Sequence, residues 1–474
     1  MMAAAMRPKV VLYNPPTVFW TMPLALLAVG SALDRARVDV VIVDGRFETE
    51  ERLLAELDGA LCLGITVLTG RPLAAAAAIV RRARRRRPDL PVIWGGWHPS
   101  LFPASCVEEG GASAAVVGQG EVTFVEIVDR LAAGHDLDGV AGCWTGGLAG
   151  EAVANPPRPL QDLNGFPAHD YHLIDVEATF RAKGRRQLDY VTSQGCRFRC
   201  GFCADPAVFG RAWTGLEPAR VIDELTALHR RHGFTDLSFQ DETFFTSRKR
   251  VEAIAEGLLE AGMGFTWTAT LRADQGRRLP DEVAALCRRA GLREVVLGVE
   301  SGSPETLRRI RKDITVDDVL ATAEALLRHG IGAAVGIIVG FPDEPEESVM
   351  ASLDMASRLA AMSPAFRVSI FAYQPTPGGE LWDDLVAGSG GVPTSLDQWC
   401  DFDYVNGTSA FLEPKLRRLV EGYRFYHRLA FAPHGGSLRR PLRALARWRV
   451  SHHEYGLAAE RRLVEWLRAG RETS

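Results

Sequence analysis

Two series of alternating strand-like and helix-like segments limit what this chain can fold into. In the first, from residue 8 to about 135, short β-branched runs are separated by Ala-, Leu- and Arg-rich segments of helical period. Continuous apolar strands that alternate with helices are typical of a doubly wound parallel sheet. The expected strands are Lys9–Tyr13, Val38–Val43, Ala60–Val67, Pro91–Trp94 and Ala114–Val117, and the helices include Pro23–Asp34, Pro72–Arg85 and Glu121–Leu131. We therefore predict an α/β domain over residues 1–140.

The second series of strands and helices has longer repeats. Six β/α units at this spacing favour a partial (β/α)6 barrel of the TIM type over a second open sheet. Its expected strands are Asp189–Ser193, Asp236–Gln240, Phe265–Thr270, Glu294–Val299, Ala333–Val339 and Arg367–Tyr373. We place this barrel at residues 187–385, after a Gly- and Pro-rich linker with a small hairpin at 141–186. A mainly helical C-terminal cap should follow at 386–474.

Charge and composition narrow the class of protein. A formal net charge of −4 gives no electrostatic case for binding nucleic acid or an anionic membrane. No apolar run reaches the length of about 18 residues that a spanning helix needs, and the first residues lack the layout of a signal peptide. Eight cysteines in 474 residues are too few for a disulfide framework and indicate a reducing compartment. We expect a soluble, cytoplasmic protein that acts on a small molecule.

Three of the eight cysteines are crowded into one short segment. Cys196, Cys200 and Cys203 directly follow the first expected strand of the barrel. Three thiolates on one loop can ligate three irons of a [4Fe–4S] cube and leave the fourth iron open for chemistry. A zinc site that adds His232 is the alternative, although zinc usually takes paired cysteines with a separate second pair. The other five cysteines are scattered singly, which is typical of small core residues.

These three cysteines, with Phe202 before the last of them, match the cluster motif of the radical S-adenosylmethionine (SAM) superfamily. The resemblance implies that the amino and carboxylate groups of SAM chelate the open iron. It also implies that reductive cleavage of SAM yields a 5′-deoxyadenosyl radical, with the electron coming from a donor such as flavodoxin or ferredoxin. The cofactors would supply the reactive chemistry, while the protein positions them.

Further SAM contacts follow from the same resemblance. Asp241 and Glu242 end the second barrel strand, where the family holds the SAM amino group, and either carboxylate could accept a hydrogen bond from it. Arg272 could contact the SAM carboxylate, and Glu300 could accept a hydrogen bond from a hydroxyl of SAM. The remaining expected contacts are Phe202, Ser301 and, on the fifth strand, Gly336 and Ile338.

Glycines at the strand ends of the first domain narrow the family. The segments Asn14-Pro15-Pro16, Gly64-Ile65-Thr66, Gly95-Gly96-Trp97-His98-Pro99 and Gly118-Gln119-Gly120-Glu121 are together similar to the Rossmann-like cobalamin-binding domain of B12-dependent radical SAM enzymes. Glycines there allow a flat corrin to approach the backbone. The implied cobalamin contacts are Pro15, Thr66, Gly95, Gly96, His98, Gly118, Gly120 and Glu121. The Asp-x-His-x-x-Gly signature is absent, so we assign His98 to the turn and not to the cobalt.

The branch that the chain resembles contains C-methyltransferases and anaerobic Mg-protoporphyrin cyclases. The leading hypothesis is therefore methyl transfer to an unactivated carbon of a specialised metabolite, through a 5′-deoxyadenosyl radical and methylcobalamin. Oxidative cyclisation, dehydration or rearrangement without methyl transfer is the second hypothesis, and a non-catalytic cobalamin or iron–sulfur carrier is the third. Aromatic residues of the cap could line a substrate pocket, although their spacing equally fits a core: Trp399, Tyr404, Tyr423 and Tyr426.

Overall fold

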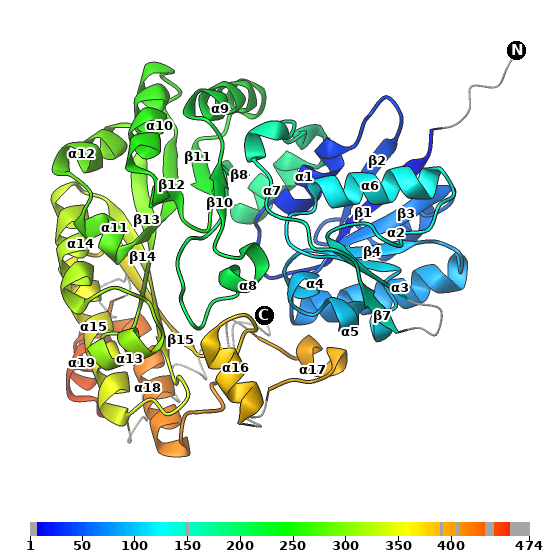
Figure 1. Ribbon diagram of the computed structural model, residues 1–474. Helices are drawn as coiled ribbons and strands as arrows, with labels where there is room; N and C mark the ends of the chain where they lie inside the picture. Colours follow the sequence, from blue (N-terminus) through cyan, green and yellow to red (C-terminus); the bar gives the residue numbers. More distant parts are fainter. Residues whose placement is uncertain (1–6, 147–150, 389–391, 404–406, 432–439, 456–474) are drawn as a thin grey trace, which may run out of the picture.

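The computed structural model describes residues 7–146, 151–388, 392–403, 407–431 and 440–455. They form two α/β bodies that lie side by side, with the first domain and the barrel on opposite sides of a junction (Figure 1). No helix among these residues is both long and apolar enough to cross a membrane.

The first domain is a seven-stranded sheet of order β2-β1-β3-β4-β5-β6-β7. Its first five strands are parallel, as predicted, and β6 and β7 add an antiparallel hairpin. The hairpin expected inside the linker therefore extends this sheet and makes it mixed. The strands are β1 (Lys9–Asn14), β2 (Asp39–Asp44), β3 (Ala60–Thr66), β4 (Val92–Gly95), β5 (Ala114–Val116), β6 (Cys143–Gly146) and β7 (Ala152–Ala154).

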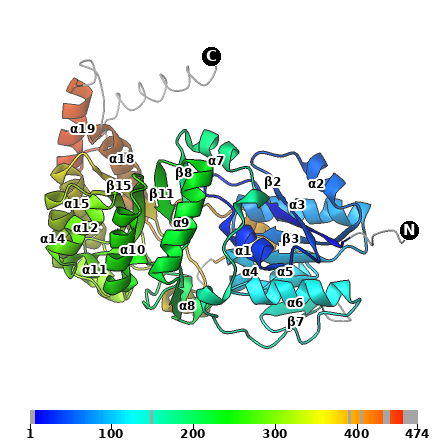
Figure 2. The same cartoon turned by 90° about the horizontal axis from the view of Figure 1, so that it is seen from above.

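Helices cover both faces of this sheet, which makes it doubly wound (Figure 2). The helix α1 contacts α6 on one face, and α2 contacts α3 on the other. Apolar residues on one side of α3 pack into the core, while its arginines point outward. The helices are α1 (Leu24–Ala32), α2 (Glu50–Glu56), α3 (Arg71–Arg86), α4 (Trp97–Leu101), α5 (Pro103–Glu108) and α6 (Glu121–Ala132).

A connector with little regular structure joins the two bodies. It holds two short 3-10 turns, Leu163–Gly165 and Tyr171–Leu173, and the helix α7 (Val176–Lys183). The side chain of Asp175 accepts a hydrogen bond from the Ala178 N–H and so caps this helix.

The second body is a six-stranded, fully parallel sheet of order β15-β14-β13-β12-β11-β8. This is the predicted partial barrel, and the carboxyl ends of its strands face one side, where barrels carry their reactive groups. Its strands are β8 (Gln187–Tyr190), β11 (Asp236–Phe239), β12 (Thr266–Arg272), β13 (Leu292–Glu300), β14 (Gly332–Val339) and β15 (Phe366–Ala372). A small ribbon of β9 (Ser193–Gly195) and β10 (Trp213–Gly215) lies beside them.

Helices cover the outside of the barrel sheet (Figure 2). They are α9 (Pro218–His232), α10 (Arg248–Glu260), α11 (Ala273–Arg277), α12 (Asp281–Arg289), α14 (Val316–Arg328) and α15 (Glu346–Met362), with a 3-10 turn at Phe244–Thr246. Two short helices, α8 (Asp205–Phe209) and α13 (Pro304–Arg309), follow strand ends instead, and α8 contacts α4 of the first domain. Large buried aromatics such as Trp267 and Phe239 fill the space between sheet and helices.

The C-terminal part is helical, as predicted, and it returns to the first domain. Its helices are α16 (Glu380–Ala387), α17 (Leu396–Cys400), α18 (Pro414–Ala430) and α19 (Arg440–His452). The segment with α16 and α17 touches both bodies, because the Leu381 N–H donates to the Gly201 carbonyl and α17 contacts α3.

Of the four cap aromatics named in the sequence analysis, the three that the structure describes are core residues. Trp399 packs on Phe102 of the first domain, at 4.6 Å between ring centroids, and Tyr423 and Tyr426 are fully buried. They therefore line none of the cavities described below, and Tyr404 lies outside the described residues.

Candidate functional site

The three motif cysteines lie on a loop that leaves the carboxyl end of the barrel after β8 and β9. Cys196 and Cys200 are buried, and Cys203 is half-buried. Gly195 enters the loop at φ +85°, where an added Cβ would lie 2.3 Å from the Ala212 carbonyl oxygen. The Gly201 N–H donates to the Ile310 carbonyl at 2.8 Å, so the loop is also anchored to the end of α13.

Arg272 supplies a positive charge beside the cysteine loop. Its guanidinium lies 3.4 Å from the Cys200 sulfur and 3.7 Å from the Phe198 ring centroid. It also pairs with Asp274 and donates to the Lys312 carbonyl. A fixed cation at this distance can balance the negative charge of a metal-bound thiolate. The structure thus brings Arg272 to the cysteines, where its expected contact with the SAM carboxylate stays a prediction.

The donor geometry fits a cluster better than a single metal ion. Burial raises the pKa of the Cys203 thiol, and a bound metal would favour its thiolate form. Among the described residues, no three His, Cys, Asp or Glu side chains lie close enough together to hold one ion. His232 ends α9 beside Arg186, before β8 begins, whereas the cysteines follow the other end of β8. The zinc alternative with His232 is therefore wrong, and a cluster held by the three motif cysteines stays the prediction.

Asp241 and Glu242 have different surroundings. Asp241 is buried and accepts hydrogen bonds from the Thr192 N–H and from the hydroxyls of Thr192 and Ser193. Glu242 accepts the Gly195 N–H, at 3.2 Å, and its side chain lines an open cavity. Burial first, and then the charge of Asp205, raise the pKa of Glu242 to about 8. Of the two carboxyls, only Glu242 is placed to meet a ligand.

Glu300 ends β13 in a left-handed backbone conformation, at φ +63°. Such a φ is uncommon for a residue other than glycine, and it turns the side chain toward Lys312, whose Nζ lies 2.7 Å from the carboxylate. Ser301 is fully buried and pairs with the Ser352 hydroxyl, away from the cavities. Its expected contact with SAM stays a prediction that this placement does not support.

A cavity of about 330 Å³, called the barrel cavity, opens at the ends of β13, β14 and β15. It brings together four residues that the sequence predicted for SAM: Phe202, Glu300, Gly336 and Ile338. Its remaining lining residues are Val296, Leu297, Gly298, Phe371, Ala372, Tyr373, Gln374 and Thr376.

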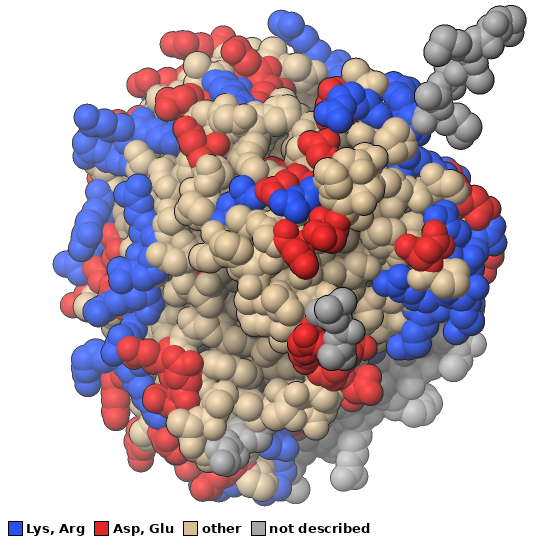
Figure 3. Space-filling view, turned by 45° about the vertical axis from the view of Figure 1, so that its right-hand side comes forward, with Lys and Arg blue, Asp and Glu red and all other residues tan. Residues whose placement is uncertain are grey.

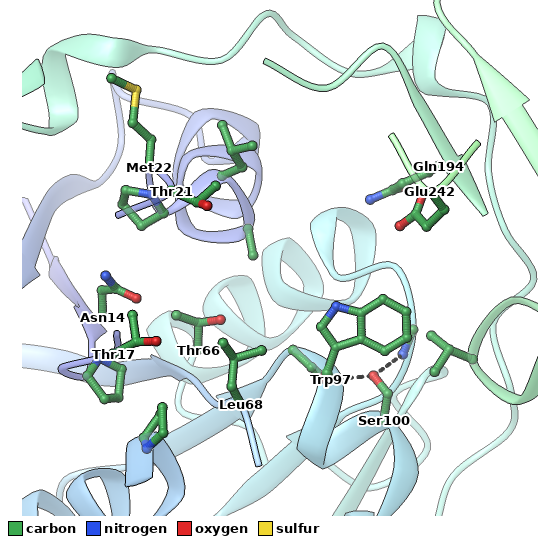
Figure 4. Close-up of a pocket in the computed structure, with 18 of the residues that line it drawn as sticks. Asn14, Thr17, Thr21, Met22, Thr66, Leu68, Trp97, Ser100, Gln194 and Glu242 are labelled. Atoms are coloured by element: carbon green, nitrogen blue, oxygen red, sulfur yellow. Dashed lines mark hydrogen bonds between the residues drawn. The ribbon is translucent and has the colours of Figure 1, made fainter. Parts of the chain in front are cut away.

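A second cavity, called the interdomain cavity, lies between the strand ends of the first domain and the cysteine side of the barrel. Its volume is about 310 Å³. Figure 4 shows Trp97 projecting into it, with Leu68 and Thr66 near its base and Gln194 and Glu242 on the far side. The two bodies meet here, because the Gln119 amide donates to the Gln194 side chain at 2.8 Å.

A smaller cavity of about 110 Å³, called the inner cavity, runs between the first sheet and the helices α1 and α6. Gly64 keeps it open, since a Cβ there would lie 2.7 Å from a Leu12 methyl group. Seven of the eight predicted cobalamin residues line the inner or interdomain cavity: Pro15, Thr66, Gly95, Gly96, Gly118, Gly120 and Glu121.

His98 lies behind these cavities and lines none of the three. It is fully buried, its Nδ1 is 3.1 Å from the Thr69 hydroxyl, and its ring contacts Phe102 and Trp399. Burial lowers its pKa to about 4, so the ring is neutral. This placement agrees with a role in the turn and gives no support to a direct cobalamin contact.

Sequence reasoning missed several residues of the interdomain cavity. Gln194 lies two positions before Cys196, and Trp97 lies inside the glycine segment Gly95–Pro99, so their places in the sequence could have indicated both. Leu68, Met22 and Phe209 carried no such signal, because only the docking of the two bodies brings them together.

Comparison with known proteins identifies the family of this chain. Residues 190–356 match the model of the radical SAM superfamily, and residues 18–128 match that of the B12-binding domain. An uncharacterized methyltransferase from Pyrococcus horikoshii is 30% identical over 461 residues, which cover 93% of this chain and 98% of the relative. The chain belongs to the B12-dependent radical SAM enzymes. Its cofactors are a [4Fe–4S] cluster, SAM and cobalamin.

Other relatives of this B12-dependent radical SAM enzyme have different named activities. The anaerobic magnesium-protoporphyrin IX monomethyl ester cyclase of Synechocystis is 26% identical over 343 residues, 70% of this chain and 67% of the cyclase. Solved structures share the fold. TsrM from Kitasatospora setae, with cobalamin and a [4Fe–4S] cluster bound, has a TM-score of 0.71 at 22% identity and covers 82% of this chain and 80% of its own. OxsB with aqua-cobalamin has a TM-score of 0.76 at 19% identity over 98% of this chain and 75% of its own.

Proposed function

We propose that this enzyme transfers a methyl group to an unactivated carbon of a small molecule. The observation that carries the proposal is the interdomain cavity, because the glycine-bearing strand ends and the cysteine side of the barrel open onto the same space. A similarity that spans nearly the whole of a relative named as a methyltransferase supports it. When bound, the cluster and SAM supply a carbon-centred radical, and cobalamin supplies a transferable methyl group.

The residues present fit these cofactors. The three motif cysteines would hold the cluster, with Arg272 balancing the negative charge of their thiolates. The SAM ammonium would favour the ionised form of Glu242, which would then accept a hydrogen bond from it. Glu300, held by Lys312, would accept a hydrogen bond from a hydroxyl of SAM. The predicted backbone contacts of Gly336 and Ile338 line the same barrel cavity as Glu300.

The first domain would bind cobalamin through its two cavities. The corrin would lie in the interdomain cavity over Thr66, Gly96 and Gly118, where the lack of bulky side chains lets the backbone approach. The inner cavity beside Gly64 and Phe124 would receive the nucleotide tail. No described histidine lines either cavity, so we propose that cobalt has no histidine ligand from this chain.

The chain's own contribution to the reaction is to orient the reactants and to keep water out. Trp97 of the first domain and Phe209 of the barrel make an edge contact across the interdomain cavity, at 6.0 Å between ring centroids. Apolar side chains such as Leu68 and Val208 line the same space. A dry, shaped site protects a radical from quenching by solvent.

The test is anaerobic incubation of the reconstituted enzyme with reductant, cobalamin, candidate substrates and SAM that carries a fully deuterated methyl group. Methyl transfer is expected to give a product that gains one methyl group and retains its deuterium, as measured by mass spectrometry. The second candidate, favoured by the similarity to the cyclase, gives a product without that methyl group. Reproducible SAM cleavage with only such a product would refute methyl transfer.

A further inference from the structure

Neither of the two cavities where the reactants would meet is lined by a described cationic side chain. Lys and Arg make up 55 of the 474 residues, yet no described residue lining the interdomain or the barrel cavity is one of them. Among the described residues of these linings, the carboxyl side chains are Glu242 and Glu300, and both become negative when they ionise. The barrel side of the interdomain cavity consists of Gln194, Val208, Phe209 and Glu242.

An anionic substrate would find no partner in such a lining. A phosphate or carboxylate loses several kcal/mol of hydration on burial, and proteins offset this with Arg, Lys or a metal. Two cations beside the SAM residues and the cysteines are already engaged. Lys312 pairs with Glu300 at 2.7 Å, and Arg272 pairs with Asp274 at 3.1 Å beside the cysteines.

A separate observation concerns the rim of the interdomain cavity. The loop after β1 lines the cavity with Pro15, Thr17, Thr21 and Met22, and between them it exposes Val18, Phe19 and Trp20. These three side chains are 64%, 47% and 42% exposed, so the loop is apolar where it meets water. An apolar segment that water contacts is unfavourable unless a ligand or partner covers it.

The apolar rim is built rigidly. Trp20 stacks on Phe47 at 5.9 Å between ring centroids. Beneath both rings lies the Arg46 guanidinium, whose side chain is 1% exposed and which donates to the carbonyls of Phe19 and Thr21. Its charge is balanced by a two-pronged pair with Asp44, so it offers no cation to a ligand. Figure 3 shows Lys and Arg gathered mostly toward the edges of one face, with uncharged residues and some acidic and basic groups between them.

From the linings without a cationic side chain and from the apolar rim we infer the substrate class, resting on the proposed function. The substrate is an uncharged, largely apolar molecule, lipid-like or polycyclic. Its reacting part lies between Phe209 and the barrel cavity, and a hydrocarbon portion too long for the cavity lies on the rim of Phe19, Trp20 and Phe47. Substrates with a phosphate, phosphonate or carboxylate near the reacting carbon are excluded by the same lining.

The test uses two fluorescent probes with the same four-ring hydrocarbon, pyrenemethanol and pyrenecarboxylate. Fluorescence anisotropy measures their binding to the enzyme loaded with cluster, cobalamin and SAM. The neutral probe is expected to bind at least ~10-fold more tightly than the anion, because only the anion loses hydration without gaining a partner. Equal or tighter binding of the anion would overturn the inferred class.

Two variants locate the bound probe. Val208→Arg adds a cation to the lining and is expected to reverse the preference, with Val208→Met as the size control. Trp20→Ser is expected to weaken pyrenemethanol binding about 5-fold by removing a stacking ring, whereas Trp448→Ser, which removes a Trp that is 50% exposed on α19, is expected to change nothing. An unchanged preference for the neutral probe in Val208→Arg contradicts binding of the reacting part in the cavity. An unchanged affinity in Trp20→Ser contradicts binding of the hydrocarbon portion on the rim. A shift in oligomeric state with Trp20→Ser, measured by light scattering, assigns the rim to a second copy instead.

Probe binding and methyl transfer are independent readouts. A product without the deuterated methyl group refutes the proposed function while leaving the probe preference intact. Methyl transfer to an anionic substrate refutes the substrate class while leaving the proposed function intact.

Discussion

The two adjacent carboxyls after β11 are expected to respond to mutation in opposite ways. Asp241→Ala should destabilise the fold without acting on a ligand directly, because every contact of Asp241 is internal. Glu242→Gln should leave the fold intact and weaken SAM binding, because the Gly195 N–H that it accepts is 3.2 Å away and its side chain faces the interdomain cavity.

The magnitudes follow from the contacts. Asp241 accepts the Thr192 N–H at 2.8 Å and the Ser193 hydroxyl at 2.5 Å, and it faces the buried Arg250, whose charge lowers the pKa that burial raises. Removing one partner from such a buried, charged network costs about 3–5 kcal/mol. Glu242→Gln conserves shape and loses one weak contact, about 1 kcal/mol or less in stability. Losing a charged partner for the SAM ammonium costs about 1.5–3 kcal/mol in binding.

Urea unfolding of the metal-free proteins, followed by circular dichroism, measures the first effect. Calorimetric titration of the reconstituted enzymes with SAM measures the second. Asp241→Asn and Ser193→Ala serve as controls, because the first conserves the shape of the side chain and the second removes one donor only. The reasoning is refuted if Asp241→Ala unfolds at the wild-type urea concentration but loses SAM affinity, since the ligand carboxylate would then be Asp241.

Three further predictions concern the cluster, the pH dependence and the turn histidine. Replacing the three motif cysteines with Ala should abolish the iron and sulfide content after anaerobic reconstitution, whereas Cys287→Ala, which removes a buried core thiol, should not; unchanged iron in the triple variant contradicts the cluster assignment. Burial and Asp205 raise the pKa of Glu242 from 4.5 to about 8, so the native state favours the protonated form and the urea midpoint of the metal-free protein should fall as pH rises from about 4.5 to 8; the same slope in Glu242→Gln contradicts this. Electron paramagnetic resonance of the cob(II)alamin enzyme should show no nitrogen splitting that His98→Ala removes, because His98 lies outside the cavities.

Much of the fold followed from local pattern. Buried parallel strands appear in a sequence as continuous apolar runs. The five parallel strands of the first domain and the six of the barrel were therefore predicted within a few residues. The hairpin of β6 and β7 was expected, but not its pairing with β5, because the Gly- and Pro-rich sequence around it reads as a linker. Edge pairing depends on which surface lies nearby, and local sequence does not contain that information.

The residues of the candidate site also differ in how far the sequence alone can predict them. The cysteine loop and the glycine segments are short motifs whose spacing carries their chemistry, so they could be found in the sequence. The division of labour between Asp241 and Glu242 depends on Thr192 and Ser193, almost fifty residues earlier in the chain. The interdomain cavity needs two domains to dock, and its aromatic pair of Trp97 and Phe209 has no local signature.

The segment that returns from α16 to the first domain has a consequence for how the enzyme is made. Gly379 sits so close to the Gly201 carbonyl that an added Cβ would lie 2.1 Å from it, so this segment covers the cysteine loop tightly. Leu381 is synthesised about 180 residues after Cys203. At translation rates of about 5–20 residues per second, the thiols leave the ribosome roughly 10–40 s before their cover exists. During this interval the cysteine loop has no cover from the C-terminal segment, because residues 379–381 do not yet exist.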